Sequence, residues 1–399
     1  MMKVKHRLLI VCTSVTLFMW YSVWFKTNPT ITILEKTVGM EIAKTYPYSK
    51  MKYILQWTNP NTEPFLYMGR GQQTFIKRRC PVNNCFVTSD KTLLSDLTEY
   101  DAVLFHGPEI SKHLIRWPRR RSQHQKFVFV SKEASTNYPL FYQLYNDFFN
   151  WTWTYKLNSD TYYGYVMIKN KLGDIISPRE DKHWLKLEEM EPISEKLKNK
   201  LDSKTIAAAW FVSHCVVKSR RNRIAKLLQK ELANYNMTID IYGSCGTKRC
   251  PRYQANKCLR MLERNYYFYL AFENSIAEDY VTEKLLHALQ HYTVPIVYGG
   301  ANYTRFMPDG AYLNVRPLDI KGLARQMVEI ITDKKKYYDF FRWTNHYSYH
   351  YGEEFPETDY YCNFCSQIND VEAVKRVSRY ENFLAWWNEK NRTGPRTGT

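Results

Sequence analysis

The sequence predicts an α/β protein in which two parallel-sheet domains follow an N-terminal membrane anchor. Three observations predict it: short, continuously apolar runs, helical segments between them, and one long apolar run close to the N-terminus. Continuous apolar runs are typical of strands buried on both faces, and strands that alternate with helices form parallel sheets with right-handed crossovers. The 399 residues, 44% of them hydrophobic, are enough for two such cores.

The long apolar run covers residues 8–25, which is enough to span a bilayer. Basic side chains precede it, and aromatic side chains near its end stand where an interfacial belt would lie. A cleaved signal peptide is the alternative, but the small residues of a cleavage site are missing. Positive charge on the N-terminal side therefore predicts a cytosolic tail at 1–7, a short stem at 26–50 and a lumenal remainder.

Two further patterns agree with a lumenal chain. Four sequons follow the anchor and are candidates for N-glycosylation: Asn150, Asn236, Asn302 and Asn391. Cys12 lies in the anchor, which leaves an even number of lumenal cysteines, and in an oxidising compartment these favour disulfides over zinc. They are Cys80, Cys85, Cys215, Cys245, Cys250, Cys258, Cys362 and Cys365.

The formal net charge of +18 suits an anionic partner or a solvated surface. A lumenal protein does not meet nucleic acid, so we expect no nucleic-acid partner. A diphosphate-bearing ligand or simple solvation then accounts for the charge. The sequence contains neither a dinucleotide fingerprint nor a P-loop, and it has no D-x-D triplet, so no metal site is expected.

The elements follow one another in an order that places the domain boundary near residue 200. The predicted N-terminal domain, 51–200, has β-type runs at 100–106 and 126–131. The predicted C-terminal domain, 201–345, has such runs at 205–213, 237–243, 266–273 and 293–299, and helical spacing at 221–234, 283–291 and 320–331. We expect the charged segment 164–204 to connect the two sheets, and 346–399 to form a C-terminal tail.

Residues 273–284, ENSIAEDYVTEK, concentrate polar side chains between a predicted strand and a predicted helix. Ligands of parallel α/β sheets bind beyond the carboxyl ends of strands, where helix N-termini offer unpaired N–H groups. A structural alternative is a capping box of Ser275 and Glu278, with Glu283 and Lys284 in the first helical turn. On the residues alone, the ligand site and the structural alternative both stay open.

The stretch FYLAFENS followed by YVTEK resembles the donor-binding signature of the α1,3-fucosyltransferases. Over about residues 50–370, other stretches look like family motifs in family order: CPVNNC, DAVLFH, NWTWTYKLNSD, DIYGSCG, VPIVYGG, NYTRFMPDGAYLNV and CNFC. The resemblance implies that the chain is an invertebrate member of the family. It also implies the B-type glycosyltransferase fold, in which two Rossmann-like domains face each other. It also implies a single-pass type II protein of the Golgi membrane.

The resemblance further implies that the tail packs back on the N-terminal domain, with Cys362 and Cys365 bridging to Cys80 and Cys85. Pairing within each local motif is the alternative. Among Cys215, Cys245, Cys250 and Cys258 the sequence leaves the pairing open.

The activity that the resemblance implies is inverting transfer of L-fucose from GDP-β-L-fucose to a GlcNAc hydroxyl of a glycoprotein glycan. The acceptor is either the core GlcNAc of N-glycans or an outer, Lewis-type GlcNAc. No cofactor is expected, and a divalent metal is not expected to be essential. The alternative is a catalytically inactive lumenal protein of the same fold that binds a sugar nucleotide or glycan.

Such a transfer needs a base, positive charge for the departing diphosphate and contacts to the fucose. Glu133, which follows a predicted strand, is the expected base, although its Glu-Ala-Ser context departs from the Glu-Ser-Pro of the family. His106 is a rival for which an acceptor contact or a structural role is expected. Lys284 and Arg221 are the expected cations, and Arg220 or Arg223 is the alternative to Arg221.

The other expected donor contacts are Ser213, Tyr242, Asn274, Tyr280 and Glu283. Ser213 precedes His214 where the family commonly has asparagine. Glu273 is expected to be a structural hydrogen-bond acceptor, and Glu278 and Asp279 are expected to be solvated.

Overall fold

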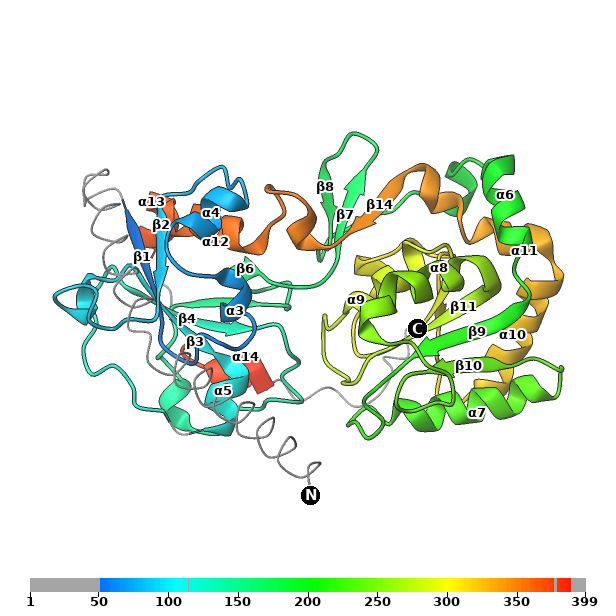
Figure 1. Ribbon diagram of the computed structural model, residues 1–399, viewed down its shortest axis with the longest axis horizontal. Coiled ribbons are helices and arrows are strands. Elements are labelled where there is room, and N and C mark those ends of the chain that lie inside the picture. Colours follow the sequence, from blue (N-terminus) through cyan, green and yellow to red (C-terminus); the bar gives the residue numbers. More distant parts are fainter. Residues whose placement is uncertain (1–50, 114, 377–378, 389–399) are drawn as a thin grey trace, which may run out of the picture.

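The computed structural model describes residues 51–113, 115–376 and 379–388, which form two lobes joined by a narrow middle layer (Figure 1). The predicted tail, anchor and stem (1–50) and Asn391 lie outside the described residues. Within the described ranges, no helix is both long enough and apolar enough to cross a membrane.

The first lobe is built on a six-stranded parallel sheet of order β2-β1-β3-β4-β5-β6. Its strands are β1 (Lys52–Gln56), β2 (Cys85–Thr88), β3 (Ala102–His106), β4 (Lys126–Ser131), β5 (Trp151–Thr154) and β6 (Thr161–Tyr162). One face is covered by α3 (Phe65–Met68), α4 (Gln73–Lys77) and α12 (Tyr360–Asn369), and the other by α5 (Gly107–Lys112) and α14 (Phe383–Asn388). Continuous apolar runs form these strands because both faces of the sheet are buried.

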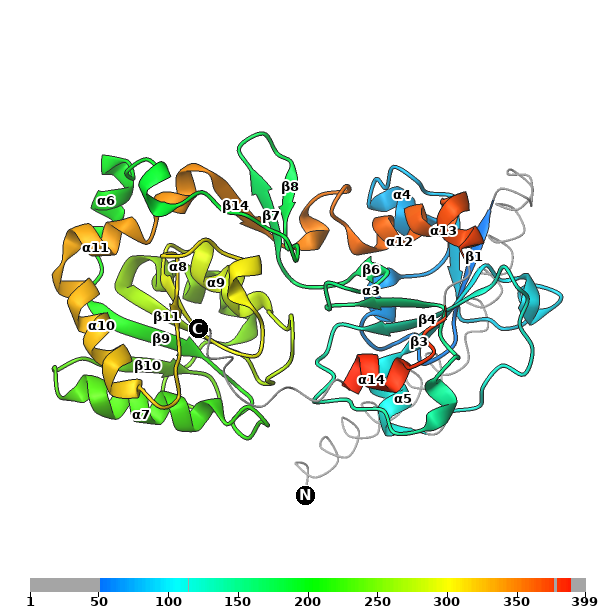
Figure 2. The same cartoon turned by 180° about the vertical axis from the view of Figure 1, so that it is seen from behind.

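The second lobe is a five-stranded parallel sheet of order β10-β9-β11-β12-β13. Its strands are β9 (Ile206–Phe211), β10 (Ile239–Tyr242), β11 (Tyr266–Phe272), β12 (Val294–Tyr298) and β13 (Leu313–Asn314). The helices α7 (Arg221–Ala233) and α10 (Ile320–Thr332) pack on one face, and α8 (Ala255–Asn265) and α9 (Glu283–Leu289) on the other. Two further helices, α6 (Glu195–Asp202) and α11 (Lys334–Asp339), lie at its outer end (Figure 2).

The segment 164–204 leads from the first sheet to the second, as expected, but it also forms strands of its own. This segment contains β7 (Met167–Asn170) and β8 (Ile175–Ser177), and β7 pairs antiparallel with β14 (Tyr347–His350) from far along the chain. The resulting three-stranded sheet lies between the lobes at the top of Figure 1. Its strands are short and depend on a partner about 180 residues away, which a local pattern does not reveal.

After β14 the chain returns to the first lobe, where it forms α12, α13 (Val371–Lys375) and finally α14 (Figure 1). Two disulfides fasten this segment, Cys80–Cys362 and Cys85–Cys365. The pairing implied by the resemblance is therefore confirmed, and pairing within each local motif is wrong.

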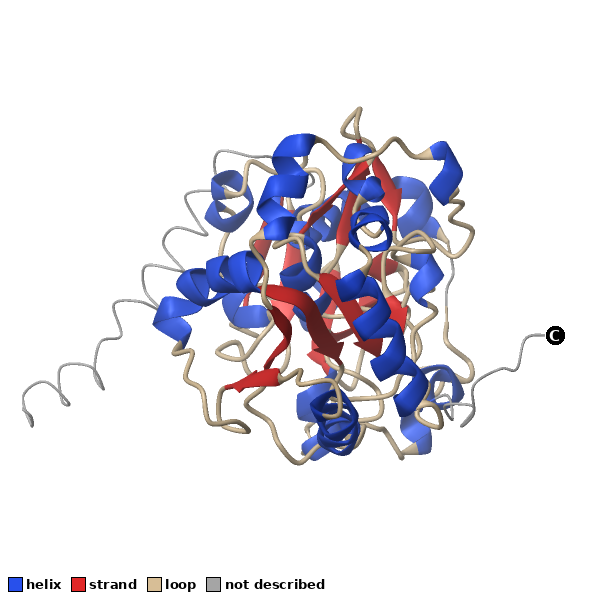
Figure 3. Ribbon diagram, turned by 90° about the vertical axis from the view of Figure 1, so that its right-hand side faces the viewer, coloured by secondary structure: helices blue, strands red, loops and turns tan. Residues whose placement is uncertain are grey.

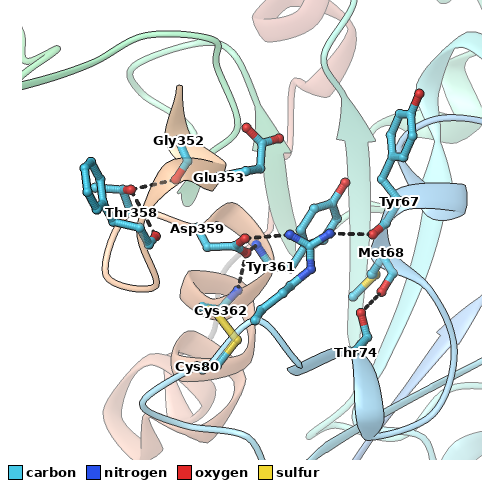
Figure 4. Close-up of polar contacts among 12 residues, drawn as sticks. Tyr67, Met68, Thr74, Cys80, Gly352, Glu353, Thr358, Asp359, Tyr361 and Cys362 are labelled. Carbon is cyan, nitrogen blue, oxygen red and sulfur yellow. Dashed lines mark hydrogen bonds and ion pairs between the residues drawn. A yellow bond between two sulfur atoms is a disulfide. The ribbon is translucent and has the colours of Figure 1, made fainter. Parts of the chain in front are cut away.

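A charged contact reinforces the same junction (Figure 4). Arg78 contacts Asp359 at 2.6 Å and donates to the Tyr67 carbonyl oxygen at 2.7 Å. Asp359 also caps α12 by accepting from the backbone N–H groups of Tyr361 and Cys362. Seen along the long axis, strands fill the interior and helices lie outside (Figure 3).

Candidate active site

The loops that leave the carboxyl ends of β4 and β11 meet between the lobes. Tyr280 Oη donates to Glu133 Oε2 at 3.4 Å, and Ser275 Oγ donates to Asn137 Oδ1 at 3.0 Å and also contacts Thr136. Lys218, from the loop after β9, donates to the Thr136 carbonyl. Polar side chains of both lobes therefore meet where the carboxyl ends of the two sheets face each other.

The capping-box alternative for this motif is wrong. The N-cap of α9 is Thr282, which makes no side-chain capping bond, and Ser275 directs its hydroxyl to the first lobe. Residues 273–282 form a loop between lobes rather than a helix start.

Glu133 lies immediately after β4 in a largely buried position. Burial raises the pKa of its carboxyl above the ordinary 4.5, while Lys284 and the Tyr280 hydroxyl act in the opposite direction. A buried carboxylate with a raised pKa is suited to general-base work near neutral pH.

Tyr280 is enclosed by two other tyrosines. Its ring lies edge-on to Tyr155, with centroids 5.0 Å apart, and to Tyr165, with centroids 6.4 Å apart. Only 2% of Tyr280 is exposed. The aromatic packing fixes the direction in which its hydroxyl meets Glu133.

Lys284 is a cation that the second lobe places among polar side chains of the same motif. Its Nζ lies 2.6 Å from Thr282 Oγ1, 3.0 Å from Glu283 Oε1 and 3.2 Å from Glu273 Oε2. Burial works against its charge, but the two carboxylates outweigh this and raise the pKa of Lys284. Lys284 is therefore a fixed positive charge.

The two carboxylates beside Lys284 differ in environment. Glu273 is buried and accepts from the Thr282 N–H at 2.9 Å and from its hydroxyl, so its expected role as a structural acceptor is confirmed. Burial raises the pKa of Glu273. Burial also acts to raise the pKa of Glu283, but Lys284 outweighs it and holds that pKa at about 2. Glu283 is therefore ionised near neutral pH.

Arg221, the first residue of α7, is the buried member of the three arginines considered. It donates to the Phe272 carbonyl at 2.7 Å and to the His214 carbonyl at 3.3 Å, and its Nε is buried without a hydrogen-bond partner. Arg220 and Arg223 are exposed. Arg221 thus joins the ends of β9 and β11, where its spare Nε is available to a ligand.

The loop that precedes Arg221 is tied to the motif. Ser219 Oγ donates to the Glu273 carbonyl at 2.8 Å, and the Ser219 N–H donates to the Asn274 carbonyl at 3.3 Å. The side-chain oxygen of Asn274 is buried without a partner, which leaves it available to a ligand.

The expectation that Asp279 is solvated is wrong. Asp279 is 4% exposed, accepts from the Leu157 N–H at 3.1 Å and contacts Arg305 at 2.8 Å. Its φ of +56° is left-handed, a conformation that Asp tolerates better than most residues. Asp279 therefore joins the lobes and sets the turn that presents Tyr280. Glu278 is exposed as expected.

Three expected site residues lie away from this cluster or face other partners. Tyr242 bonds the Tyr266 hydroxyl at 2.7 Å, in a network that ends on Asp240. Ser213 is exposed just beyond β9. His106, at the end of β3, packs on Phe65, and burial lowers its pKa to about 4. A neutral His106 suits a contact or structural role.

Sequence reasoning did not name Lys132, Tyr155, Tyr165 or Lys218 among the site residues. A signal for the tyrosines existed, because residues 155–165, which overlap the end of the motif NWTWTYKLNSD, contain four tyrosines. The contact of Lys218 had no local signal, since its partner belongs to the other lobe.

Two further disulfides lie at the same edge of the second sheet. Cys215–Cys245 joins the loops after β9 and β10. Cys250–Cys258 joins the segment that precedes α8 to the first turn of α8. These settle the pairing that the sequence left open. Among the residues that the structure describes, no group of three or more His, Cys, Asp and Glu side chains is placed to hold a metal ion.

The sequons within the described ranges differ in exposure. Asn236 and Asn302 are exposed, and the Asn302 side chain accepts from Thr304. Asn150 is half-buried and accepts from the Phe127 N–H at 2.9 Å.

Comparisons with known proteins assign the chain to a family. The model described as "Glycosyltransferase family 10 (fucosyltransferase) C-term" matches residues 201–387, and "Fucosyltransferase, N-terminal" matches residues 49–166. "Alpha-(1,3)-fucosyltransferase C" of Drosophila melanogaster is 34% identical over 77% of this chain and 70% of that protein. A Pan troglodytes protein, "4-galactosyl-N-acetylglucosaminide 3-alpha-L-fucosyltransferase FUT6", is 32% identical over 74% of each chain.

A solved structure titled "Crystal Structure of alpha1,3-Fucosyltransferase with GDP-fucose" is also similar. It covers 83% of this chain and 92% of its own, with 15% identity and a TM-score of 0.49. On the family models and the relatives, the chain belongs to glycosyltransferase family 10 and is an α1,3-fucosyltransferase.

Proposed function

We propose that this enzyme transfers L-fucose from GDP-β-L-fucose to a GlcNAc hydroxyl of a glycoprotein glycan, with inversion at the anomeric carbon. The observation that carries the proposal is the meeting of Glu133 from one lobe with Tyr280 and the Lys284 cluster from the other. A base from one lobe and a cation from the other, brought together where the lobes meet, are what a single displacement requires.

In the proposed reaction Glu133 takes the proton of the acceptor hydroxyl. The acceptor oxygen attacks the anomeric carbon of fucose, and the bond from that carbon to the β-phosphate oxygen breaks. GDP departs with the bonding electron pair, so the β-linked donor gives an α1,3-linked product. Attack and departure occur on opposite faces, which produces the inversion.

The proposed cations for the departing GDP are Lys284 and Arg221. Arg221 is buried and the Lys284 side chain is only 14% exposed, so water screens their charges little at the carboxyl edge of the second sheet. Arg221 has a spare Nε for a phosphate oxygen, and we prefer it to the exposed Arg220 and Arg223.

The remaining donor contacts are proposed on the same wall. Glu283 accepts from hydroxyl groups of the sugar or ribose, and Asn274 offers its unpartnered side-chain oxygen. Tyr280 supports the base. We propose Ser213, just beyond the carboxyl end of β9, as a further donor contact. For Tyr242 we propose a supporting rather than a direct role, because its hydroxyl already has partners.

The division of labour follows the two sheets. We propose that 51–200 holds the acceptor and 201–345 holds GDP-fucose, in the B-type glycosyltransferase arrangement, with 346–399 fastened to the first lobe. We also propose that residues 8–25 anchor the enzyme in the Golgi membrane with its catalytic region in the lumen.

The acceptor is proposed to be either the core GlcNAc of N-glycans or an outer, Lewis-type GlcNAc. The Pan troglodytes relative carries a 4-galactosyl-N-acetylglucosaminide acceptor in its name, and a Drosophila melanogaster relative, 30% identical over 57% of its length, is named "Glycoprotein 3-alpha-L-fucosyltransferase A". Similarity to both leaves the two acceptor types as the candidates.

The test is transfer by the full chain, purified in detergent, from GDP-fucose to a panel of N-glycan core and N-acetyllactosamine acceptors. We expect one acceptor class to be fucosylated in α1,3 linkage, and we expect the activity to persist in EDTA because protein cations can balance the diphosphate. Glu133→Gln should abolish transfer while GDP still binds. Tight GDP binding without transfer to any acceptor by the unaltered enzyme would contradict the proposal and favour a binding protein.

A further inference from the structure

We propose that Lys132 is a positioning residue that holds the catalytic-base loop against the C-terminal segment of the chain. The proposal deepens the proposed function, since it rests on Glu133 as the base. Lys132 precedes Glu133 directly, and no step of the transfer described above uses it.

The Lys132 ammonium group lies within a group of three tyrosine rings. Its Nζ lies 4.6 Å from the ring centroid of Tyr165, 4.9 Å from that of Tyr163 and 5.0 Å from that of Tyr360. Glu353 adds a carboxylate oxygen at 3.4 Å. Each ring at such a distance attracts a cation electrostatically, by about 0.5–2 kcal/mol depending on desolvation. The side chain of Lys132 is 23% exposed, so these attractions are only partly screened.

The contacts come from three separate parts of the chain. Lys132 follows β4, Tyr163 and Tyr165 follow β6, and Glu353 and Tyr360 belong to the segment after β14. That segment is fastened close by, because Figure 4 shows Glu353 near the contact of Asp359 and the Cys80–Cys362 disulfide. The cation thus ties the base loop to the most strongly cross-linked part of the first lobe.

A chain of contacts leads from this cage to the base. Tyr165 donates from its hydroxyl to the Lys132 carbonyl at 3.2 Å and packs edge-on against Tyr280. Tyr280 donates to Glu133, and Ser131 Oγ donates to the Glu133 carbonyl at 3.0 Å. The carbonyl groups of Lys132 and of Glu133 are therefore both fixed, and the ring that holds Lys132 also holds the donor to the carboxylate.

The influence of Lys132 is geometric. The charges that act on the pKa of Glu133 are those of Lys284, Glu283 and Glu273, all in the second lobe. Because Lys132 is not among these charges, its removal should act on the rate chiefly through the position of the carboxylate. Misplacement by about 1 Å can reduce the rate of a positioned reaction by about 100-fold.

The test compares Lys132→Met and Lys132→Arg with the unaltered full-length enzyme. Methionine keeps the length of the side chain and removes the charge, whereas arginine keeps the charge. We expect kcat of Lys132→Met to fall by about 10- to 100-fold. We expect the KM for GDP-fucose to stay within about two-fold and the acid limb of the pH profile to stay in place. Lys132→Arg should recover most of kcat.

Two controls make the result specific. Lys171→Met removes an exposed lysine in the β7–β8 turn and should leave kcat unchanged. Glu353→Gln removes only the ion pair, which is partly exposed, so we expect a smaller loss of about two- to five-fold.

Several outcomes would overturn the proposal. If Lys132→Met keeps kcat within two-fold while Glu133→Gln is inactive, the base stands and the positioning role does not. If Lys132→Met loses GDP-fucose affinity and melts earlier in proportion, or arginine fails to restore kcat, the residue is merely structural. If Glu133→Gln transfers fucose normally, the proposed function fails first, and the positioning role fails with it.

Discussion

The hydroxyl of Tyr280 lies 3.4 Å from a carboxylate oxygen of Glu133, although the two residues are 147 positions apart in sequence. They belong to different lobes, so the environment of the proposed base depends on both. Burial raises the pKa of Glu133, and the second lobe partly offsets this through Lys284 and Tyr280. The protonation state of the base is therefore a property of the closed pair of lobes.

The raised pKa of Glu133 sets the acid limb of kcat/KM. A base works when deprotonated, and a raised pKa means that the proton is retained to higher pH. We expect activity to fall, as the pH is lowered, at a pH above the ordinary glutamate value of 4.5. Tyr280→Phe removes a hydrogen bond to the ionised form, so the limb should move to higher pH. A limb that moves to lower pH in Tyr280→Phe would contradict this assignment.

Lys284→Met should separate a structural role from a catalytic one. The change leaves the buried Glu273 carboxylate without its cation, so we expect a loss of about 3–5 kcal/mol in the free energy of unfolding. Adding Glu273→Gln removes the orphan charge and should recover part of that loss, as measured by denaturant unfolding. GDP affinity should stay low in the double variant. Recovery of GDP affinity together with stability would show that Lys284 does not bind the diphosphate.

Asp279→Ala should loosen the contact between the lobes. It leaves the Leu157 N–H without its acceptor and removes the shortest of the ion pairs of Arg305, which costs about 1–3 kcal/mol. Asp279→Asn should cost less, because asparagine tolerates the left-handed backbone and keeps an oxygen for Leu157. Thermal unfolding compares the two, and kcat should fall in the same order. Equal losses would mean that the ion pair alone matters.

The two disulfides of the first lobe should be strongly non-additive. With Cys80–Cys362 removed by serine substitution, Cys85–Cys365 still closes the long loop, and the chain-entropy model gives a cost of about 2–3 kcal/mol. Removing both opens a loop of 280 residues, and the same model gives about 8 kcal/mol. The check is denaturant unfolding of three variants: the two that each lack one disulfide and the one that lacks both. Additive losses would contradict the parallel arrangement.

Much of the second lobe could be predicted from the sequence. The runs at 266–273 and 293–299 are apolar without interruption, and they became β11 and β12 within one residue of the predicted bounds. The spacing at 221–234 and 320–331 likewise became α7 and α10. Local pattern was sufficient here because strand and helix each bury a large apolar surface.

The first lobe and the middle layer were predicted less completely. The strands β1, β2, β5 and β6 were not predicted, because they are short or mixed with polar residues. The middle sheet joins β7 to β14 across the sequence, and no local period records such a pairing.

Within the site, the sequence identified the motif but not the contacts of its members. The burial of Asp279 depends on Leu157, 122 residues before it, and on Arg305, 26 residues after it. A carboxylate between two polar neighbours looks solvated until its partners are known.

The bridges from Cys80 and Cys85 to Cys362 and Cys365 also constrain how the protein is made. Sequence separations of 282 and 280 mean that the first two cysteines are synthesised long before their partners. Throughout that interval they are close to each other and must remain unpaired or be released by disulfide exchange. These two bridges can therefore close only after most of the chain has been made, and a chain truncated before residue 362 would leave Cys80 and Cys85 without their native partners.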